Sequence, residues 1–134
     1  MVTDRVGDFI IRLQNAAAIG KASVSVPYSV HIQTIAKKLK ELGFLTSVEV
    51  KAKGESEVKK EIIVALSYDE RGTPKLRGVK RISKPGRRLY VSSTEAHRVK
   101  GGTGARLISS SAGIISDKEA RANQTGGENL FEIW

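Results

Sequence analysis

Cysteine is absent from the 134-residue sequence, and aromatic residues make up only 5% of it. Without cysteine the chain has no disulfide, no cysteine-ligated zinc and no thiol chemistry. Long apolar runs are also missing: the longest, Ile62–Leu66, is far shorter than the roughly 20 residues that cross a bilayer. Residues 1–8 include Asp4 and Asp8 and contain no apolar core, so we expect no secretion signal and a cytoplasmic chain.

Sequence patterns typical of enzymes are missing as well. His31 and His97 lie in unrelated segments, whereas a metal site needs three or four converging ligands. The run 101–104 is glycine-rich but lacks the phosphate-loop sequence, and Leu107 occupies the third glycine position of the dinucleotide-binding motif. No strand-turn motif presents a nucleophile. The sequence therefore predicts no catalytic residues, no metal, no cofactor and no small-molecule substrate, and the glycine run is interpreted as a turn between strands.

Acidic residues are almost absent from one segment of the chain. Residues 71–106 hold eleven Lys and Arg against one acid, Glu95, which is a local charge of +10 and accounts for the whole net charge of +9. A basic surplus gathered in one place indicates a polyanionic partner. The alternative is a solvated basic face that only improves solubility.

The basic residues are densest around Pro85-Gly86. Residues 78–90 contain five cations, namely Lys80, Arg81, Lys84, Arg87 and Arg88. A turn brings these mutually repelling charges together, and a nucleic acid relieves the repulsion because each neutralised phosphate releases counterions. Phosphate contacts position a protein without selecting a sequence. The stretch therefore predicts contacts with a nucleic-acid backbone.

Selective contacts need smaller polar groups close to bases and sugars. Ser109-Ser110-Ser111 places three hydroxyls before Ala112-Gly113, and hydroxyls both donate to and accept from base edges and the ribose 2′-OH. In isolation a serine run is also typical of a plain polar loop. Tyr90 has two interpretations as well: it stacks on a base or ribose, or it belongs to the core.

Hydrophobic periodicity predicts an α+β chain. In the first half, we expect helices over 3–20 and 29–43, a strand over 23–26, and a hairpin of strands over 48–52 and 62–66. The second half reads as strand, turn and strand around Pro85-Gly86, then a strand from Leu107 into the serines. The sequence Ser116-Asp117-Lys118-Glu119 matches a capping box and predicts a short helix to about Gln124, before a last strand over 130–134.

The polar, turn-rich segment Asp69–Pro74 marks the best internal boundary. We therefore expect two small α+β subdomains packed together. Residues 1–70 form the first, with the order α-β-α-β-β, and residues 71–134 form a second, mostly β subdomain that has one short helix and binds RNA.

Six motifs follow one another along the chain: Asp4 with Arg12-Leu13-Gln14-Asn15; Pro27-Tyr28-Ser29 leading to Leu39-Lys40-Glu41-Leu42-Gly43-Phe44; Arg81-Ile82-Ser83-Lys84-Pro85-Gly86-Arg87-Arg88-Leu89-Tyr90; Ser109-Ser110-Ser111 with Gly113; Asp117 with Glu119-Ala120-Arg121; and Gly126-Gly127-Glu128. In this order and spacing they resemble the bacterial-type family of small-subunit ribosomal protein S8. The resemblance covers essentially the whole chain.

The resemblance implies a two-subdomain α+β protein that binds the central domain of small-subunit rRNA, aids assembly and carries out no chemistry. It implies neighbouring ribosomal proteins as further partners, no membrane, and a place in the small ribosomal subunit of a bacterium or a plastid. The charge pattern and the resemblance together predict a set of RNA-binding residues. The basic stretch contributes Arg81, Lys84, Arg87 and Arg88, and the resemblance implies Ser109, Ser110, Ser111, Tyr90, Gly126, Gly127, Glu128, Arg12, Asn15 and Ser29.

The chain departs from the usual family pattern at five positions, two of which, Asn129 and Glu132, stand in a terminal strand that is usually more apolar. Ser110 stands where threonine is usual, and Val30 and Ile32 stand where lysines usually follow the Pro-Tyr-Ser segment. Two other functions remain as alternatives. One is a translational regulator that binds a messenger RNA resembling the rRNA site, and the other is a nucleic-acid-processing enzyme, which would need converging carboxylates or a divalent metal.

Overall fold

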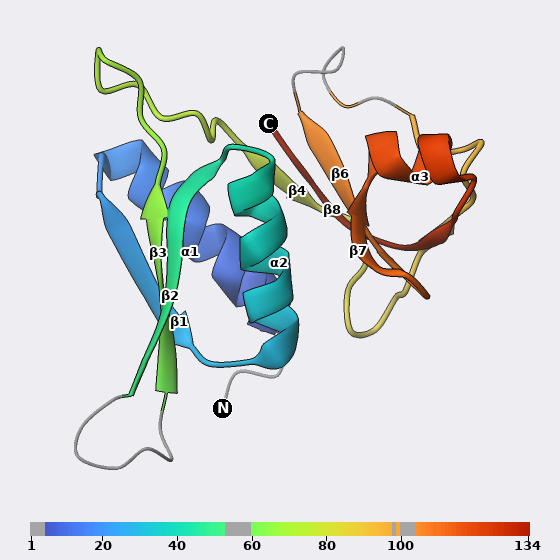
Figure 1. Cartoon of the computed structure of the whole chain (residues 1–134), viewed down its shortest axis with the longest axis horizontal. Helices are drawn as coiled ribbons and strands as arrows, with labels where there is room; N and C mark the ends of the chain where they lie inside the picture. Colours follow the sequence, from blue (N-terminus) through green and yellow to red (C-terminus); the bar gives the residue numbers. More distant parts are fainter. Residues whose placement is uncertain (1–4, 53–59, 98, 100–103) are drawn as a thin grey trace. The chain divides into compact units, whose positions relative to one another are not determined.

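The computed structural model describes residues 5–52, 60–97, 99 and 104–134. The chain divides into two compact units, Met1–Arg77 and Gly78–Trp134. Helices and antiparallel sheets alternate as predicted, and the α+β class is confirmed (Figure 1).

Residues 71–77 belong to the first unit, where they contact Phe44, Ser67 and Tyr68. The amide of Lys75 donates to the Ser67 carbonyl at 3.0 Å, and the Lys75 ammonium lies 5.6 Å from the centre of the Phe44 ring. Tyr68 and Pro74 form an isolated β-bridge. The boundary after residue 70 stays a prediction.

Two amphipathic helices form the first unit's core with its sheet. Helix α1 (Arg5–Ile19) buries residues that recur every three or four positions, and it ends at Gly20, whose φ of 76° suits glycine. Helix α2 (Val30–Glu41) follows Ser29, and Gly43 lies just beyond its end at φ 92°. Ser29 occupies the N-cap position as predicted, but its hydroxyl makes no capping hydrogen bond.

The first sheet has the order β1-β3-β2, with antiparallel pairing throughout. Its strands are β1 (Ser23–Pro27), β2 (Leu45–Ala52) and β3 (Lys60–Leu66). Alternate residues of β3 are buried, and both helices contact the sheet's strands (Figure 1). The predicted hairpin of β2 and β3 is confirmed, and its connection lies outside the described residues.

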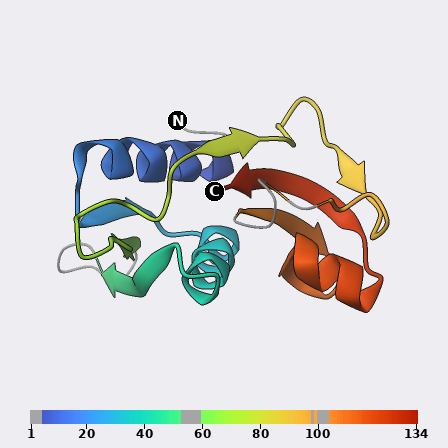
Figure 2. The ribbon, with the colours of Figure 1, turned by 90° about the horizontal axis from the view of Figure 1, so that it is seen from above.

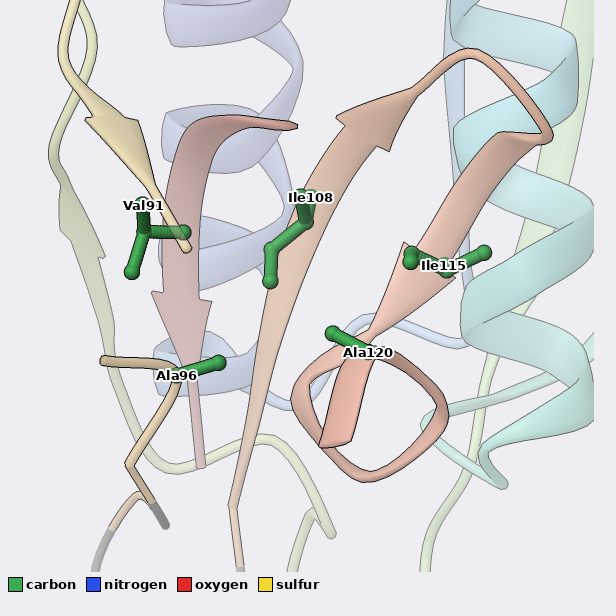
Figure 3. Packing of buried hydrophobic residues seen from close by; sticks show 5 residues of the cluster. All are labelled: Val91, Ala96, Ile108, Ile115 and Ala120. Atoms are coloured by element: carbon green, nitrogen blue, oxygen red, sulfur yellow. The ribbon is translucent and has the colours of Figure 1, made fainter. Parts of the chain in front are cut away.

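The described residues of the second unit form a five-stranded sheet and one helix. The strands are β4 (Val79–Arg81), β5 (Tyr90–Val91), β6 (Ala105–Ser110), β7 (Gly113–Ser116) and β8 (Gly127–Ile133). Their order is β4-β8-β6-β7, and β5 also pairs with β8. Helix α3 (Asp117–Asn123) packs on β6 and β7. Buried aliphatic side chains from α3, the strands and a connecting segment pack together in one cluster (Figure 3): Val91, Ala96, Ile108, Ile115 and Ala120.

Strand β7 was not predicted. The sequence pattern extended the preceding strand through Ser111, whereas the chain turns at Ser111-Ala112 and returns as β7, with Gly113 at φ 109°. Because β7 has only four residues, Gly-Ile-Ile-Ser, it is too short to show alternation. The helix after it was predicted correctly. The Ser116 hydroxyl accepts from the Glu119 amide at 3.3 Å, and Gln124 ends α3 in the left-handed conformation.

Replacing Ser116 by alanine should lower the free energy of unfolding by about 0.5–2 kcal/mol, because a helix amide then loses its acceptor. Urea unfolding followed by circular dichroism measures the change. Ser111→Ala is the matched control, since Ser111 is an exposed turn residue. Equal losses in the two variants would contradict the capping role.

Candidate nucleic-acid interface

Within the basic stretch, residues 78–90, the chain forms a loop at the edge of β8. The strands before and after this loop, β4 and β5, do not pair with each other. Strand β4 pairs with β8 at Arg81 and Phe131, and β5 pairs with the same edge further along, at Tyr90 and Glu128. The chain leaves the sheet between them (Figure 2). The predicted turn is therefore confirmed, but its interpretation as a two-stranded hairpin was wrong, because β8 is long enough to bond both strands.

The loop closes tightly around Pro85-Gly86. The backbone groups of Lys84 and Arg87 exchange two hydrogen bonds, each of 2.9 Å. We call residues 84–88 the basic loop, and all five of them are exposed. Within the described ranges, no ion pair involves Lys84 or Arg87, so their charges face solvent without a neutralising acid.

The other two predicted cations of this stretch contact the protein itself. The Arg88 guanidinium lies 3.6 Å from the Glu128 carboxylate, while its side chain remains half exposed. Arg81 donates from Nε to the Ser83 carbonyl. These contacts hold both arginines close to the base of the basic loop.

Three predicted contact residues lie in one row across the sheet. Tyr90 on β5 is opposite Glu128 on β8, and Glu128 is opposite Ser109 on β6. Residues opposite each other on neighbouring strands share a face, so the three side chains are neighbours. Tyr90 is 74% exposed, which excludes the interpretation as a core residue. We call Tyr90, Glu128 and Ser109 the polar row.

The middle serine is engaged in the turn between β6 and β7. Its hydroxyl donates to the Gly113 carbonyl at 2.9 Å and accepts from the Ala112 amide at 3.2 Å. The single hydroxyl hydrogen of Ser110 is thus already used, and only acceptor capacity is left for a ligand. Ser111, at the turn itself, is exposed.

The glycine pair before the polar row is required by packing. A Cβ on Gly127 would lie 2.3 Å from the Ser109 carbonyl oxygen, and one on Gly126 would lie 2.5 Å from the Val91 carbonyl oxygen. Both distances are far below van der Waals contact. The pair therefore lets β5, β8 and β6 approach closely at this end of the sheet.

The remaining predicted contacts belong to the first unit. Arg12 is held by its own unit, with Nε 3.0 Å from the Asp8 carboxylate and Nη1 3.0 Å from the Ser25 carbonyl. Asn15 is exposed on α1, and Ser29 is partly exposed before α2. Ile32 is only 2% exposed and belongs to the core, whereas Val30 is 68% exposed. Of these two departures from the family pattern, only Val30 lies on the surface.

Ser83 was not assigned a role from the sequence. It is a small polar residue inside a basic motif, and nothing in the pattern signals that it is completely buried. Asn129 is similar: it is buried on β8, and its side-chain oxygen has no hydrogen-bond partner among the described residues.

Over the described residues, no group of three or more acidic or histidine side chains is arranged to hold a metal ion. No helix among them is both long and apolar enough to span a membrane. Residues 101–103 of the glycine run lie outside the described part of the chain.

Known proteins similar to this chain match it almost end to end. The family model for ribosomal protein S8 matches residues 4–134. A protein of Nocardioides sp. named small ribosomal subunit protein uS8 is 39% identical over 99% of this chain and 98% of its own length. Proteins of the same name from Nitratidesulfovibrio vulgaris and Crocosphaera subtropica are 40% and 39% identical, over 100% and 98% of this chain and 100% and 97% of their own lengths. The chain therefore belongs to the ribosomal protein S8 family, whose members are structural ribosomal proteins and not enzymes.

Proposed function

We propose that this chain is a constituent of the small ribosomal subunit that binds the central domain of its rRNA directly and helps that domain to fold during assembly. Membership in the ribosomal protein S8 family supports the place in the subunit. Neighbouring ribosomal proteins are the further partners in this proposal. No bond is made or broken, so the chain acts by binding alone.

The observation that carries the proposal is that the cations of the basic loop and the side chains of the polar row lie next to each other along β8. The basic loop offers Lys84 and Arg87 without neutralising acids in the described structure, and Tyr90 of the polar row follows it by two residues. Arg88 joins the two sets through its ion pair with Glu128. Cations beside exposed stacking and hydrogen-bonding groups are the combination that RNA recognition needs.

Each part has a separate task in the proposal. The basic loop neutralises phosphates and supplies affinity that falls with salt. Tyr90 supplies a flat apolar surface on which an unstacked base rests, a contact worth about 1–3 kcal/mol. Ser109 and Ser111 bring hydroxyls that meet 2′-OH groups and base edges, and the largely buried Glu128 carboxylate holds Arg88 beside them.

Titration of the protein against two rRNA fragments of equal length, one from the central domain and one from the 5′ domain, tests the proposal. Affinity for the central-domain fragment should be about tenfold higher or more, because phosphate contacts alone do not distinguish the two. Equal affinities would reduce the chain to a nonspecific RNA binder and overturn the assignment to the central domain.

Replacing both Lys84 and Arg87 by glutamine should weaken binding and flatten its salt dependence. Each phosphate contact that is lost lowers the slope of log affinity against log salt by about 0.7–0.9. Lys37→Gln with Lys40→Gln removes the same charge from exposed positions of α2 and is the control. If both double variants show the same slope, the basic loop is only a solvated surface.

The serines at the β6–β7 turn should separate into a structural and a binding residue. Ser110→Ala removes two hydrogen bonds of the turn and should lower the free energy of unfolding by about 1 kcal/mol. Ser111→Ala should leave stability within about 0.5 kcal/mol of the wild type while weakening RNA binding. Calorimetric titration and urea unfolding of both variants provide the comparison. A Ser111→Ala protein that binds as tightly as the wild type would exclude that hydroxyl from the interface.

A further inference from the structure

A completely buried hydroxyl closes the base of the basic loop. Ser83 is 0% exposed and lies just before the loop, and Leu89 lies just after it. The Ser83 hydroxyl donates to the Leu89 carbonyl at 3.1 Å and accepts from the Leu89 amide at 3.0 Å. One side chain thus makes the pair of bonds that two backbone groups make in a β-ladder.

The backbone of β8 bonds both ends of the loop at the same place. The Ser83 amide donates to the carbonyls of Asn129 and Leu130 at 3.1 and 3.2 Å, and the Asn129 amide donates to the Leu89 carbonyl at 2.9 Å. Without the Ser83 hydroxyl, the Leu89 carbonyl still accepts from the Asn129 amide, but the Leu89 amide loses the only acceptor that it has among the described residues. At the base of the loop, below the Lys84–Arg87 backbone bonds, the direct link between the two flanking residues depends on the Ser83 hydroxyl.

We infer that Ser83 is a positioning residue for RNA binding, which acts by holding the basic loop in its binding conformation before RNA arrives. The inference rests on the proposed function. Lys84 and Arg87 carry like charges at the tip, and in the described structure the Lys84–Arg87 backbone bonds and the Ser83–Leu89 bonds oppose opening of the loop. A loop that is ordered in advance loses less conformational entropy on binding. Because Ser83 is buried, its effect on RNA must pass through the loop cations.

A double-mutant cycle separates positioning from a general contribution to stability. The four proteins are the wild type, Ser83→Ala, the loop variant with Lys84→Gln and Arg87→Gln, and the combination of all three changes. Affinity for the central-domain rRNA fragment is measured at a temperature where urea unfolding shows each protein to be folded. Ile115→Val removes one methylene group from a buried side chain of β7 and is the control for lost stability.

Ser83→Ala should weaken binding about three- to tenfold in the wild-type background and less than about twofold in the loop variant, because coupled residues are not additive. Ile115→Val should leave affinity unchanged in both backgrounds. An equal loss from Ser83→Ala in the two backgrounds, or no loss in either, overturns the inference.

Amide hydrogen exchange on the wild-type protein tests the same inference without a substitution and without RNA. The Leu89 amide should be protected well beyond the amides of an open loop, because its acceptor is buried. Free exchange at Leu89 overturns the inference even if Ser83→Ala does not fold. Failure of the wild type to bind the rRNA fragment would instead overturn the proposed function, and protection at Leu89 would still decide whether Ser83 closes the loop.

Discussion

Hydrogen bonding along both edges of β8 is the constraint on which the second unit depends. One edge pairs with β6 from Ala105 to Ser109, and the other pairs with two short strands, β4 and β5, one after the other. A single continuous partner on that second edge would leave no loop. Because the partner is interrupted, residues 84–88 leave the sheet while both of their flanking segments stay anchored in it. The basic loop is thus a product of strand pairing and not a free hairpin.

The electrostatics of the chain follow a simple division. Several cations inside the two units have acids beside them, including Arg12 with Asp8, Arg106 with Glu132 and Arg121 with Asp117. At the tip of the basic loop, the described structure supplies no such acid. Mutual repulsion between exposed charges is screened by water and salt, so the fold tolerates this arrangement at small cost. The same charges become strongly favourable when a polyanion replaces the counterions.

The sequence predicts long periodic elements well and short ones poorly. Helices α1 and α2 and strands β1 and β3 were found from their apolar spacing, and α3 from its capping box, because each pattern repeats or has a local chemical signature. Strand β7 has four residues and shows no period. The pairing of both β4 and β5 with β8 joins residues far apart in sequence, such as Arg81 and Phe131, and no local pattern encodes such a contact.

The candidate site was predictable in composition but not in detail. Charge density indicated the basic loop, the chemistry of hydroxyl and aromatic groups together with the resemblance indicated the serines and Tyr90, and the resemblance alone indicated the glycine pair. The roles within the site depend on burial and hydrogen bonds, which the sequence does not display. Ser110 is engaged in a turn, Gly127 is needed for strand approach, and Ser83 is a buried hydroxyl among arginines and lysines. Small residues carry little sequence signal because they suit loops, turns and cores equally.

The departures from the family pattern have different physical consequences. At position 110 both serine and the usual threonine supply the hydroxyl that donates to the Gly113 carbonyl, so the turn is compatible with either residue. At position 32 the isoleucine is in the core and presents nothing to a ligand. Val30 differs because it is exposed at the first residue of α2, where the partial positive charge of the helix end disfavours a lysine. Valine at this position avoids the repulsion between a lysine and the helix end, which favours the start of α2. It also lacks the positive charge with which a lysine would contact an RNA phosphate.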